Sequence, residues 1–365
     1  MNLKEKAKML PSSPGVYLMK NSHGSIIYIG KSKNLKNRVE SYFTNSSTHS
    51  PKVIKLIKNI KDFDYIVTDT EFEAFLLECK LIKEIKPIFN SKMKNPNSYC
   101  YIKIEINRKY PNIEISDEFN IDDGNIYFGP YTNKNTVLRA IQGIKECCRI
   151  LCSNDFLRTS KCLNYSLGLC IGMCFNDNAK EQYNDVIHKI TNLLYGTDRE
   201  IIELIKNKMI TSSEKYDFES AAKYRDYLSA VNYLVNKIKV IEFIKKNRNI
   251  LLFEKLNSKE FKIFLLKGIK ILFNKKYMLL EDNFKEIACE ISSNISYYFN
   301  NNTFEKSVNI EKNEADESQI IYSYLKNKSN NCSYFFIPYK KLNKKNMKID
   351  TKIESLLKKS FATSN

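Results

Sequence analysis

The first 90 residues contain side chains suited to phosphodiester chemistry. Arg38 and Tyr42 are four residues apart in a segment with helical periodicity, so they share one face, and Lys31 lies just before that segment. An arginine holds a phosphate through paired hydrogen bonds and keeps its proton. A lysine beside a tyrosine hydroxyl would lower the pKa of the phenol toward that of a useful base. Without further spacing evidence, the simpler interpretation is that Tyr17 and Tyr28 are ordinary strand residues and the cations are surface charges.

Glu78 is the carboxylate best placed to hold a cation. Residues 71–85 have the pattern of a helix, and at 100° per residue Glu78 falls inside an apolar stripe. A carboxylate among apolar neighbours is costly unless it is paired or binds a cation. The pattern leaves three interpretations open: a metal ligand, a partner for a buried Lys or Arg, or a side chain at the edge of the stripe. A second apolar stripe on the same helix contains Phe72, Phe75, Leu76 and Cys79.

The elements that must position these residues follow from local patterns. The runs 15–19, 26–29 and 63–68 are rich in β-forming residues, and Asn21-Ser22-His23-Gly24 is typical of a hairpin turn between the first two. Helical patterns cover 35–43, 51–60 and 71–85. These patterns predict an α+β fold in which helices pack on a small sheet.

The spacing of these residues resembles the GIY-YIG nuclease signature. Gly15-Val16-Tyr17 is followed, after ten residues, by Tyr28-Ile29-Gly30, and Pro14 precedes the first glycine. Thr70–Glu78 is similar to the family's T-E-x-E-A-x-x-L-E helix, and Lys86–Asn90 to the segment that ends in its Asn.

The GIY-YIG resemblance implies a three-stranded antiparallel sheet flanked by helices and a Mg²⁺ or Mn²⁺ ion on Glu78. It also implies that water attacks the phosphate with Tyr28, assisted by Lys31, as general base. Arg38 and the metal would stabilise the developing charge. Tyr17, Tyr42 and Asn90 would position phosphate and water.

A cysteine cluster forms the second group of chemical residues. Six of the ten cysteines fall between Cys147 and Cys174, which in a reducing compartment favours metal over disulfides. Four of them form the series Cys152-x9-Cys162-x7-Cys170-x3-Cys174. These spacings fit neither a zinc knuckle nor a ferredoxin run, so zinc, an iron–sulfur cluster and metal-free buried thiols all stay open.

Residues 161–174 closely resemble the cysteine-rich segment of the UvrC family of nucleotide-excision-repair subunits. The family pattern is P-C-L-x-Y-x-x-G-x-C-x-G-P-C, and this chain has Lys161 and Met173 where the family usually has proline. The resemblance implies a [4Fe–4S] cluster on Cys152, Cys162, Cys170 and Cys174, with Zn²⁺ as the alternative.

A helical hairpin follows, with patterns over 198–210 and 217–235 and a predicted break at Thr211-Ser212-Ser213. By pattern alone it is an αα-hairpin that packs on its own domain. However, Tyr216–Asp226 is similar to the UVR motif, L-E-F-E-x-A-A-x-x-R-D, with Tyr and Asp in place of the first Leu and Glu. That resemblance implies docking on a UvrB-like helicase subunit through Phe218, Ala221, Ala222 and Arg225.

Composition agrees with a nucleic-acid partner without proving one. The chain has 365 residues and a formal charge of +18, which favours an anionic partner, although a Lys-rich genome composition would have the same effect. No apolar run approaches the ~18 residues of a membrane helix, and the charged N-terminus does not resemble a signal peptide. The prediction is therefore a cytosolic protein with no membrane partner.

The order of the motifs is that of the N-terminal half of UvrC, similar to the single-nuclease homologue Cho. The predicted parts are a nuclease domain (10–95), a β/α extension (96–146), a Cys-rich segment (147–178), a helical region (180–240) with the hairpin (198–235), a degenerate C-terminal α/β region (245–340) and a basic tail (341–365). Within the extension, 101–106 and 113–115 are predicted strands, and 127–131 is a predicted turn.

The family resemblance implies a metal-dependent endonuclease that makes the 3′ incision in damaged duplex DNA beside a UvrB-like subunit. Two other functions stay open. One is a non-catalytic module that competes with UvrC for UvrB. The other is a GIY-YIG nuclease with no role in repair.

Overall fold

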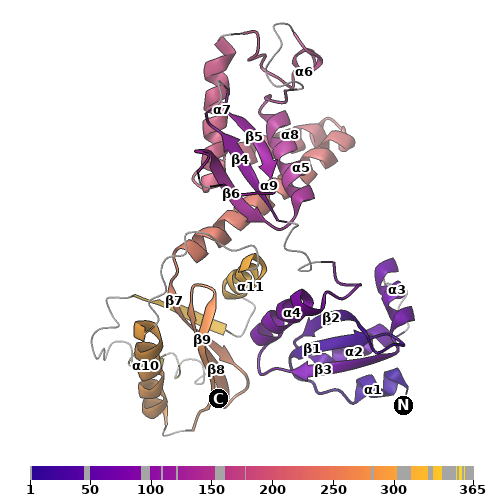
Figure 1. Cartoon of the computed structure of the whole chain (residues 1–365), viewed down its shortest axis with the longest axis vertical. Coiled ribbons are helices and arrows are strands. Elements are labelled where there is room, and N and C mark those ends of the chain that lie inside the picture. The colour runs from indigo at the N-terminus through magenta and orange to yellow at the C-terminus, as the bar shows by residue number, and fades with distance from the viewer. Residues whose placement is uncertain are drawn as a thin grey trace. The chain divides into compact units, whose positions relative to one another are not determined.

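A computed structural model shows two compact units (Figure 1). One contains residues 1–95 and most of the chain after Phe243, and the other contains residues 96–242. The structure describes residues 2–44, 50–91, 99–107, 110–120, 122–152, 161–176, 178–280, 283–301, 314–327, 332–338, 351, 353–355 and 357. The predicted basic tail, 341–365, therefore lies almost entirely outside the described residues.

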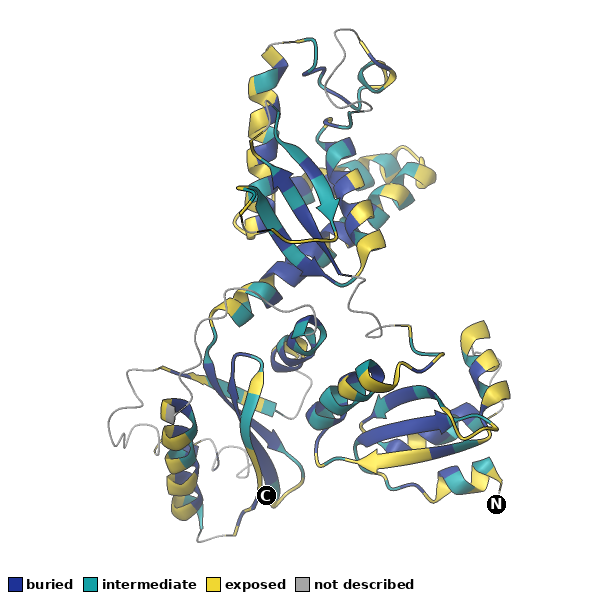
Figure 2. Ribbon diagram, in the orientation of Figure 1, coloured by how far each residue is buried: buried dark blue, intermediate teal, exposed yellow. Residues whose placement is uncertain are grey.

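The N-terminal domain contains the predicted three-stranded antiparallel sheet. Its strands are β1 (Gly15–Lys20), β2 (Ile26–Ser32) and β3 (Asp62–Val67), in the order β2-β1-β3. The tight turn after β1 is the predicted one, because the amide of Asn21 bonds to the carbonyl of Ser25 and Gly24 adopts a φ of 73°. The central strand β1 is buried almost throughout, whereas β3 is largely exposed (Figure 2).

Four helices complete this domain: α1 (Leu3–Lys8), α2 (Leu35–Phe43), α3 (Pro51–Asn59) and α4 (Glu71–Ile85). The helix α4 begins at a capping box, in which Thr70 caps the amide of Glu73 and the Glu73 side chain bonds back to Thr70. It ends at Lys86, which adopts a left-handed conformation with φ 52°. Part of the T-E-x-E pattern therefore fixes where the helix starts.

The two apolar stripes of α4 pack on two different sheets. Ala74 and Ile82, with Leu77 and Leu81, lie against the core between α4 and the N-terminal sheet. Phe72, on the other side, is fully buried in a core made by the C-terminal sheet. A helix with two apolar faces needs two partners, and the C-terminal region supplies the second.

The C-terminal region of this unit is a four-stranded antiparallel sheet with a core on each face. Helix α10 (Phe284–Asn301) covers one face, while α11 (Ala315–Lys326) and α4 cover the other (Figure 1). Alternate residues of the central strands therefore point into different cores. The strands, in the order β10-β7-β8-β9, are β7 (Asn249–Lys255), β8 (Glu260–Lys267), β9 (Lys270–Met278) and β10 (Cys332–Ile337).

The second unit combines a three-stranded sheet with long helices. Its sheet has the order β5-β4-β6, and the strands are β4 (Cys100–Glu105), β5 (Asn112–Ser116) and β6 (Ile126–Tyr131). The helices are α5 (Lys134–Cys147), α6 (Leu163–Ser166), α7 (Asn178–Tyr195), α8 (Glu200–Glu214) and α9 (Phe218–Lys245), the last of which ends beyond the unit.

Two sequence predictions for this unit are wrong. Residues 127–131 form most of strand β6 rather than a turn, because they pair with β4 and bury Phe128 and Tyr131. The break in the hairpin lies at Lys215-Tyr216-Asp217 and not at Thr211–Ser213, since α8 continues to Glu214 and Tyr216 takes the left-handed turn, with φ 60°.

Among the described residues, every helix is too short or too polar to cross a lipid bilayer.

Candidate active site

The glycines of the two three-residue motifs are required by close packing. A Cβ on Gly30 would lie 2.3 Å from the hydroxyl oxygen of Tyr17, and one on Gly15 would lie 2.3 Å from the carbonyl oxygen of Ile66. The sheet register places Tyr17 directly opposite Gly30. The ring of Tyr17 therefore packs over Gly30, where the lack of a side chain leaves room for it.

Three tyrosines gather around this contact, and they differ in exposure. The hydroxyls of Tyr17 and Tyr42 share a hydrogen bond of 2.8 Å, and both residues are buried, with 1% and 5% of their surface exposed. Burial raises the pKa of Tyr17 well above its ordinary value. Tyr28 is half-buried, with its ring centre 6.2 Å from that of Tyr17. Of the three, Tyr28 is the phenol best placed to contact a water molecule.

Arg38 lies against the same tyrosines. Its Nε donates a hydrogen bond of 3.4 Å to the hydroxyl of Tyr17, and its guanidinium lies 5.1 Å from the ring centre of Tyr42. Burial and the hydroxyl of Tyr42 raise the pKa of Tyr28, the carboxylate of Glu78 raises it further, and Arg38 lowers it. The predicted Tyr28, Arg38 and Glu78 are thus close enough to act on one another electrostatically.

Glu78 reaches the end of β2 from the middle of α4. The backbone amide of Lys31 donates a hydrogen bond of 3.0 Å to its Oε1. Burial raises the pKa of Glu78, and the amide and the charges of Lys31 and Arg38 oppose that rise. A half-buried carboxylate held by one amide suits a divalent cation that keeps most of its water ligands. The residues present therefore fit the cation that the sequence predicted.

The ammonium of Lys31 contacts an acidic residue and an aromatic ring of α4. It bonds to Glu71 over 2.7 Å and lies 3.5 Å from the ring centre of Phe75. The cation that lowers the pKa of Tyr28 is Arg38. No periodicity in the sequence singles out Glu71 as this partner.

The side-chain amide of Asn90 makes two hydrogen bonds with the backbone of Ile29 in β2. The amide of Ile29 donates to Oδ1 over 2.9 Å, and Nδ2 donates to the carbonyl of Ile29 over 2.8 Å. Asn90 was predicted to position phosphate and water. In the structure it holds the strand segment between Tyr28 and Gly30, and so acts on the site through the backbone.

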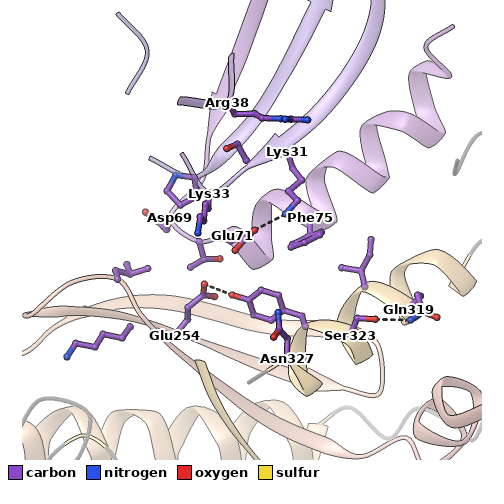
Figure 3. Close-up of a pocket in the computed structure, with 17 residues that line it drawn as sticks. Lys31, Lys33, Arg38, Asp69, Glu71, Phe75, Glu254, Gln319, Ser323 and Asn327 are labelled. Carbon is purple, nitrogen blue, oxygen red and sulfur yellow. Dashed lines mark hydrogen bonds and ion pairs between the residues drawn. The ribbon is translucent and has the colours of Figure 1, made fainter. Parts of the chain in front are cut away.

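A cavity of about 1050 Å³ borders this site (Figure 3). Lys31 and Arg38 line one side, and residues of β7 and α11, among them Glu254 and Tyr324, line the other. The sequence predicted no role for residues 245–340. The only signal for Glu254 is its alternation with Ile250 and Leu252, which places it on a buried sheet face.

The four predicted cysteines come together around Cys170. Burial raises the pKa of its thiol, a hydrogen bond from the Gly172 amide lowers it, and the neighbouring thiols of Cys152, Cys162 and Cys174 raise it. Within the described part of the chain, however, no three Cys, His, Asp or Glu side chains are placed to hold a metal ion. Residues 153–160, between the first two cysteines, lie outside the described residues.

The hairpin presents aromatic side chains at its tip. Phe218 is 66% exposed and Tyr216 is 81% exposed, with ring centres 6.2 Å apart. Ala221 and Ala222 are half-buried, and Arg225 pairs with the adjacent Asp226 over 2.9 Å. Within the hairpin, the apolar residues nearest the turn are therefore left open to a partner.

Comparison with known families matches three consecutive segments of this chain. Residues 13–91 match the UvrC-like GIY-YIG domain, residues 99–193 match the middle domain of the UvrC/Cho excinucleases, and residues 199–234 match the UvrB/UvrC motif.

Curated relatives are similar over most of this chain. The UvrABC system protein C of Alkaliphilus oremlandii is 34% identical over 347 residues, and that of Clostridium perfringens is 36% identical over 356 residues. These alignments cover 93% and 95% of this chain but 56% of each relative. The chain thus spans little more than half the length of the curated relatives it matches.

Among solved structures, the chain is similar to the GIY-YIG N-terminal endonuclease domain of UvrC from Thermotoga maritima, which was determined with its catalytic magnesium ion. The identity is 39%, the match covers 25% of this chain and 100% of that one, and the TM-score is 0.23.

Proposed function

We propose, from the premise that this chain belongs to the UvrC family, that it is a metal-dependent DNA endonuclease of nucleotide excision repair. The observation that supports the proposal is that Tyr28, Arg38 and Glu78, which the sequence signature names, lie close enough to influence one another's charge.

The mechanism assigns the proton of the attacking water to Tyr28. The water oxygen bonds to phosphorus, the ionised oxygen of Tyr28 accepts the water proton, and the bond from phosphorus to the leaving oxygen breaks. The leaving oxygen departs as an alkoxide and takes a proton from solvent, and Tyr28 returns its proton to solvent before the next turnover. Arg38 faces the negative charge that grows on the phosphate. A Mg²⁺ or Mn²⁺ ion held by Glu78 would supply further charge stabilisation at the phosphate. Because the charge of Glu78 raises the pKa of Tyr28, neutralising that carboxylate lowers it toward the range of a useful base.

The buried tyrosines and Asn90 act through position. The hydrogen bond between Tyr17 and Tyr42 fixes both rings, and Arg38 bonds to the first of them. Asn90 holds the backbone beside Tyr28. These contacts hold the base and the arginine in place before DNA binds, which is the preorganisation that phosphoryl chemistry requires.

The partner is proposed to be a UvrB-like helicase subunit bound to damaged duplex DNA, and the product a single 3′ incision. The exposed pair Tyr216 and Phe218 at the tip of the hairpin supports a protein contact, because large apolar side chains at an exposed turn are costly without one.

The four cysteines are proposed to hold a [4Fe–4S] cluster, with Zn²⁺ as the alternative. The support is the donor chemistry of four thiols and the electrostatic influence of the other three on Cys170, whereas within the described residues no three of them lie in ligating positions. The group would act structurally, by tying together the segment between α5 and α7. Anaerobically purified protein is expected to contain iron and sulfide. Zinc without iron would support the alternative. The absence of both iron and zinc would exclude a metal role.

Incision mapping tests the proposed function. A duplex with one bulky adduct, labelled on the damaged strand, is incubated with Mg²⁺ and the full chain, with and without the helicase subunit. The expected product is one cut on the 3′ side of the adduct that depends on the subunit. Cutting without dependence on the adduct or the subunit would favour a nuclease outside repair. Binding to the subunit without any cutting would favour a non-catalytic module.

A further inference from the structure

The cavity beside the active site has two walls that come from distant parts of the chain. Lys31, Lys33 and Arg38 contribute to the wall formed by the nuclease domain. The opposite wall consists of the end of β7 and one face of α11, with Lys255 and Ser323 among its residues (Figure 3). At about 1050 Å³ the space lies slightly above the ~300–1,000 Å³ of most small-molecule sites, which favours an extended ligand.

The second wall is fixed to the catalytic domain by a shared core. Phe72 of α4 is fully buried, with its ring centre 4.9 Å from that of Tyr324 and 5.1 Å from that of Phe264. The buried ammonium of Lys262 bonds to Asp69 over 2.7 Å and to Glu73 over 2.6 Å. Because Asp69 and Glu73 flank the start of α4, the helix that carries Glu78 is held to the C-terminal sheet at its N-terminal end.

The face of α11 that lines the cavity carries uncharged hydrogen-bonding side chains. Gln319 and Ser323 are four residues apart on α11 and share one face, and Asn327 follows at the same interval just beyond the end of the helix. Nε2 of Gln319 donates to the hydroxyl of Ser323 over 2.8 Å. Amides, hydroxyls and lysines are the groups that contact phosphate and sugar oxygens in nucleic-acid complexes.

The charges along the cavity favour an anionic ligand. Four cations line it: Lys31, Lys33, Arg38 and Lys255. Three carboxylates also line it: Asp69, which pairs with Lys262; Glu71, which pairs with Lys31; and Glu254.

Glu254 adds less negative charge than an ordinary carboxylate. Burial raises its pKa to about 7, so part of it is protonated at neutral pH. Its Oε1 accepts a hydrogen bond of 2.6 Å from Tyr324, while its buried Oε2 has no partner among the described residues. The hydrogen bond to Tyr324 therefore fixes the carboxyl group within the wall formed by β7 and α11.

We propose that this cavity binds the DNA strand next to the scissile phosphate, with the C-terminal sheet region as the second wall of the groove. The inference rests on the proposed nuclease function, because it takes the phosphate at Arg38 as the starting point of the strand. It assigns to residues 249–327 a direct role in substrate binding.

Photo-crosslinking tests the contact without requiring cleavage. Benzoylphenylalanine is placed at Ser323, or at the exposed Tyr297 of α10 as the control, in the full chain. The probe is a labelled duplex with one bulky adduct. We expect a DNA crosslink from position 323 at least about tenfold above that from position 297. Equal yields from the two positions would overturn the proposal.

Charge reversal supplies the second measurement. Lys255→Glu is compared with Lys285→Glu, which changes an exposed lysine on α10, the helix on the opposite sheet face. In Lys255→Glu we expect weaker binding of the same duplex and a decrease of about 1 in the salt slope of log K. The Lys285→Glu variant should match the wild type. Identical behaviour of both variants would contradict the proposed wall.

The two proposals fail in different ways. If the position-323 variant crosslinks DNA above its control but the wild-type chain never cuts DNA, the nuclease function fails and the second wall remains. If the wild type cuts DNA but position 323 and Lys255 behave as their controls, the wall fails and the nuclease function remains.

Discussion

The backbone amide of Lys31 donates a hydrogen bond to the carboxylate of Glu78. This contact joins the end of β2 to the middle of α4, so the carboxylate that is proposed to hold a cation is positioned by main chain. The side chain of the same lysine bonds to Glu71, about two turns away along the helix. The main chain of Lys31 therefore positions the Glu78 carboxylate, while the lysine side chain acts on it only through its charge.

Gly30→Ala tests the close packing of Tyr17 on β2. The new Cβ would lie 2.3 Å from the Tyr17 hydroxyl oxygen, so the ring must move and the Tyr17–Tyr42 hydrogen bond must break. We expect a loss of about 1–3 kcal/mol in the free energy of unfolding and a severe loss of nicking. Gly24→Ala is the control, since a Cβ there meets nothing within 4 Å and only its φ of 73° is strained. Equal nicking by both variants would show that the ring position is unimportant.

Tyr28→Phe and Tyr17→Phe separate the base from its support. Removal of the half-buried Tyr28 hydroxyl should abolish nicking with little change in stability. Removal of the buried Tyr17 hydroxyl removes its hydrogen bonds with Tyr42 and Arg38, and should cost about 1–3 kcal/mol of unfolding free energy. Urea unfolding and single-turnover nicking measure the two effects. A Tyr28→Phe variant that nicks at the wild-type rate would remove the tyrosine from the mechanism.

The raised pKa of Glu254 should make the free energy of unfolding depend on pH. Its folded pKa of about 7 lies above the ordinary value of 4.5, so the folded state binds its proton more tightly than the unfolded chain does. The free energy of unfolding should therefore fall as pH rises between these values, by at most about 3 kcal/mol, and level off above them. Glu254→Gln should flatten this slope, whereas Glu286→Gln, at an exposed position of α10, should keep it. Urea unfolding across this pH range checks both.

Phe218→Ala tests the hairpin as a docking surface. The side chain is 66% exposed, so its removal should leave the unfolding midpoint unchanged. Binding to a UvrB-like helicase subunit should weaken by about tenfold or more, since a buried aromatic anchor contributes at least about 2 kcal/mol. Tyr297→Ala removes a comparably exposed aromatic residue from α10 and is the control. Unchanged affinity in the Phe218 variant would exclude this residue from the interface.

The sequence predicts the N-terminal domain well because local signals act together there. The hairpin turn at Asn21–Gly24, the capping box at Thr70 and the apolar periodicity of α4 each specify structure within a few residues. The prediction for 127–131 fails because Gly129-Pro130 has the composition of a turn, while pairing with β4 decides the conformation.

The candidate site is only partly readable from sequence for a similar reason. Glu78 is visible because it interrupts an apolar stripe. The partner of Lys31 and the role of Glu254 depend on contacts between residues that are 40 and 70 positions apart. Periodicity carries no information about such pairs. The second apolar stripe of α4 is visible in the sequence, but its packing on the C-terminal sheet is seen only in the structure.

The most direct test of the account is the Mg²⁺-dependent nicking rate of Glu78→Gln. A glutamine at this position still accepts the hydrogen bond from the Lys31 amide but lacks the charge that holds a cation. We expect the nicking rate to fall by roughly a thousandfold, with DNA affinity and the unfolding midpoint unchanged. A Glu78→Gln variant that nicks DNA at the wild-type rate in Mg²⁺ would contradict the account.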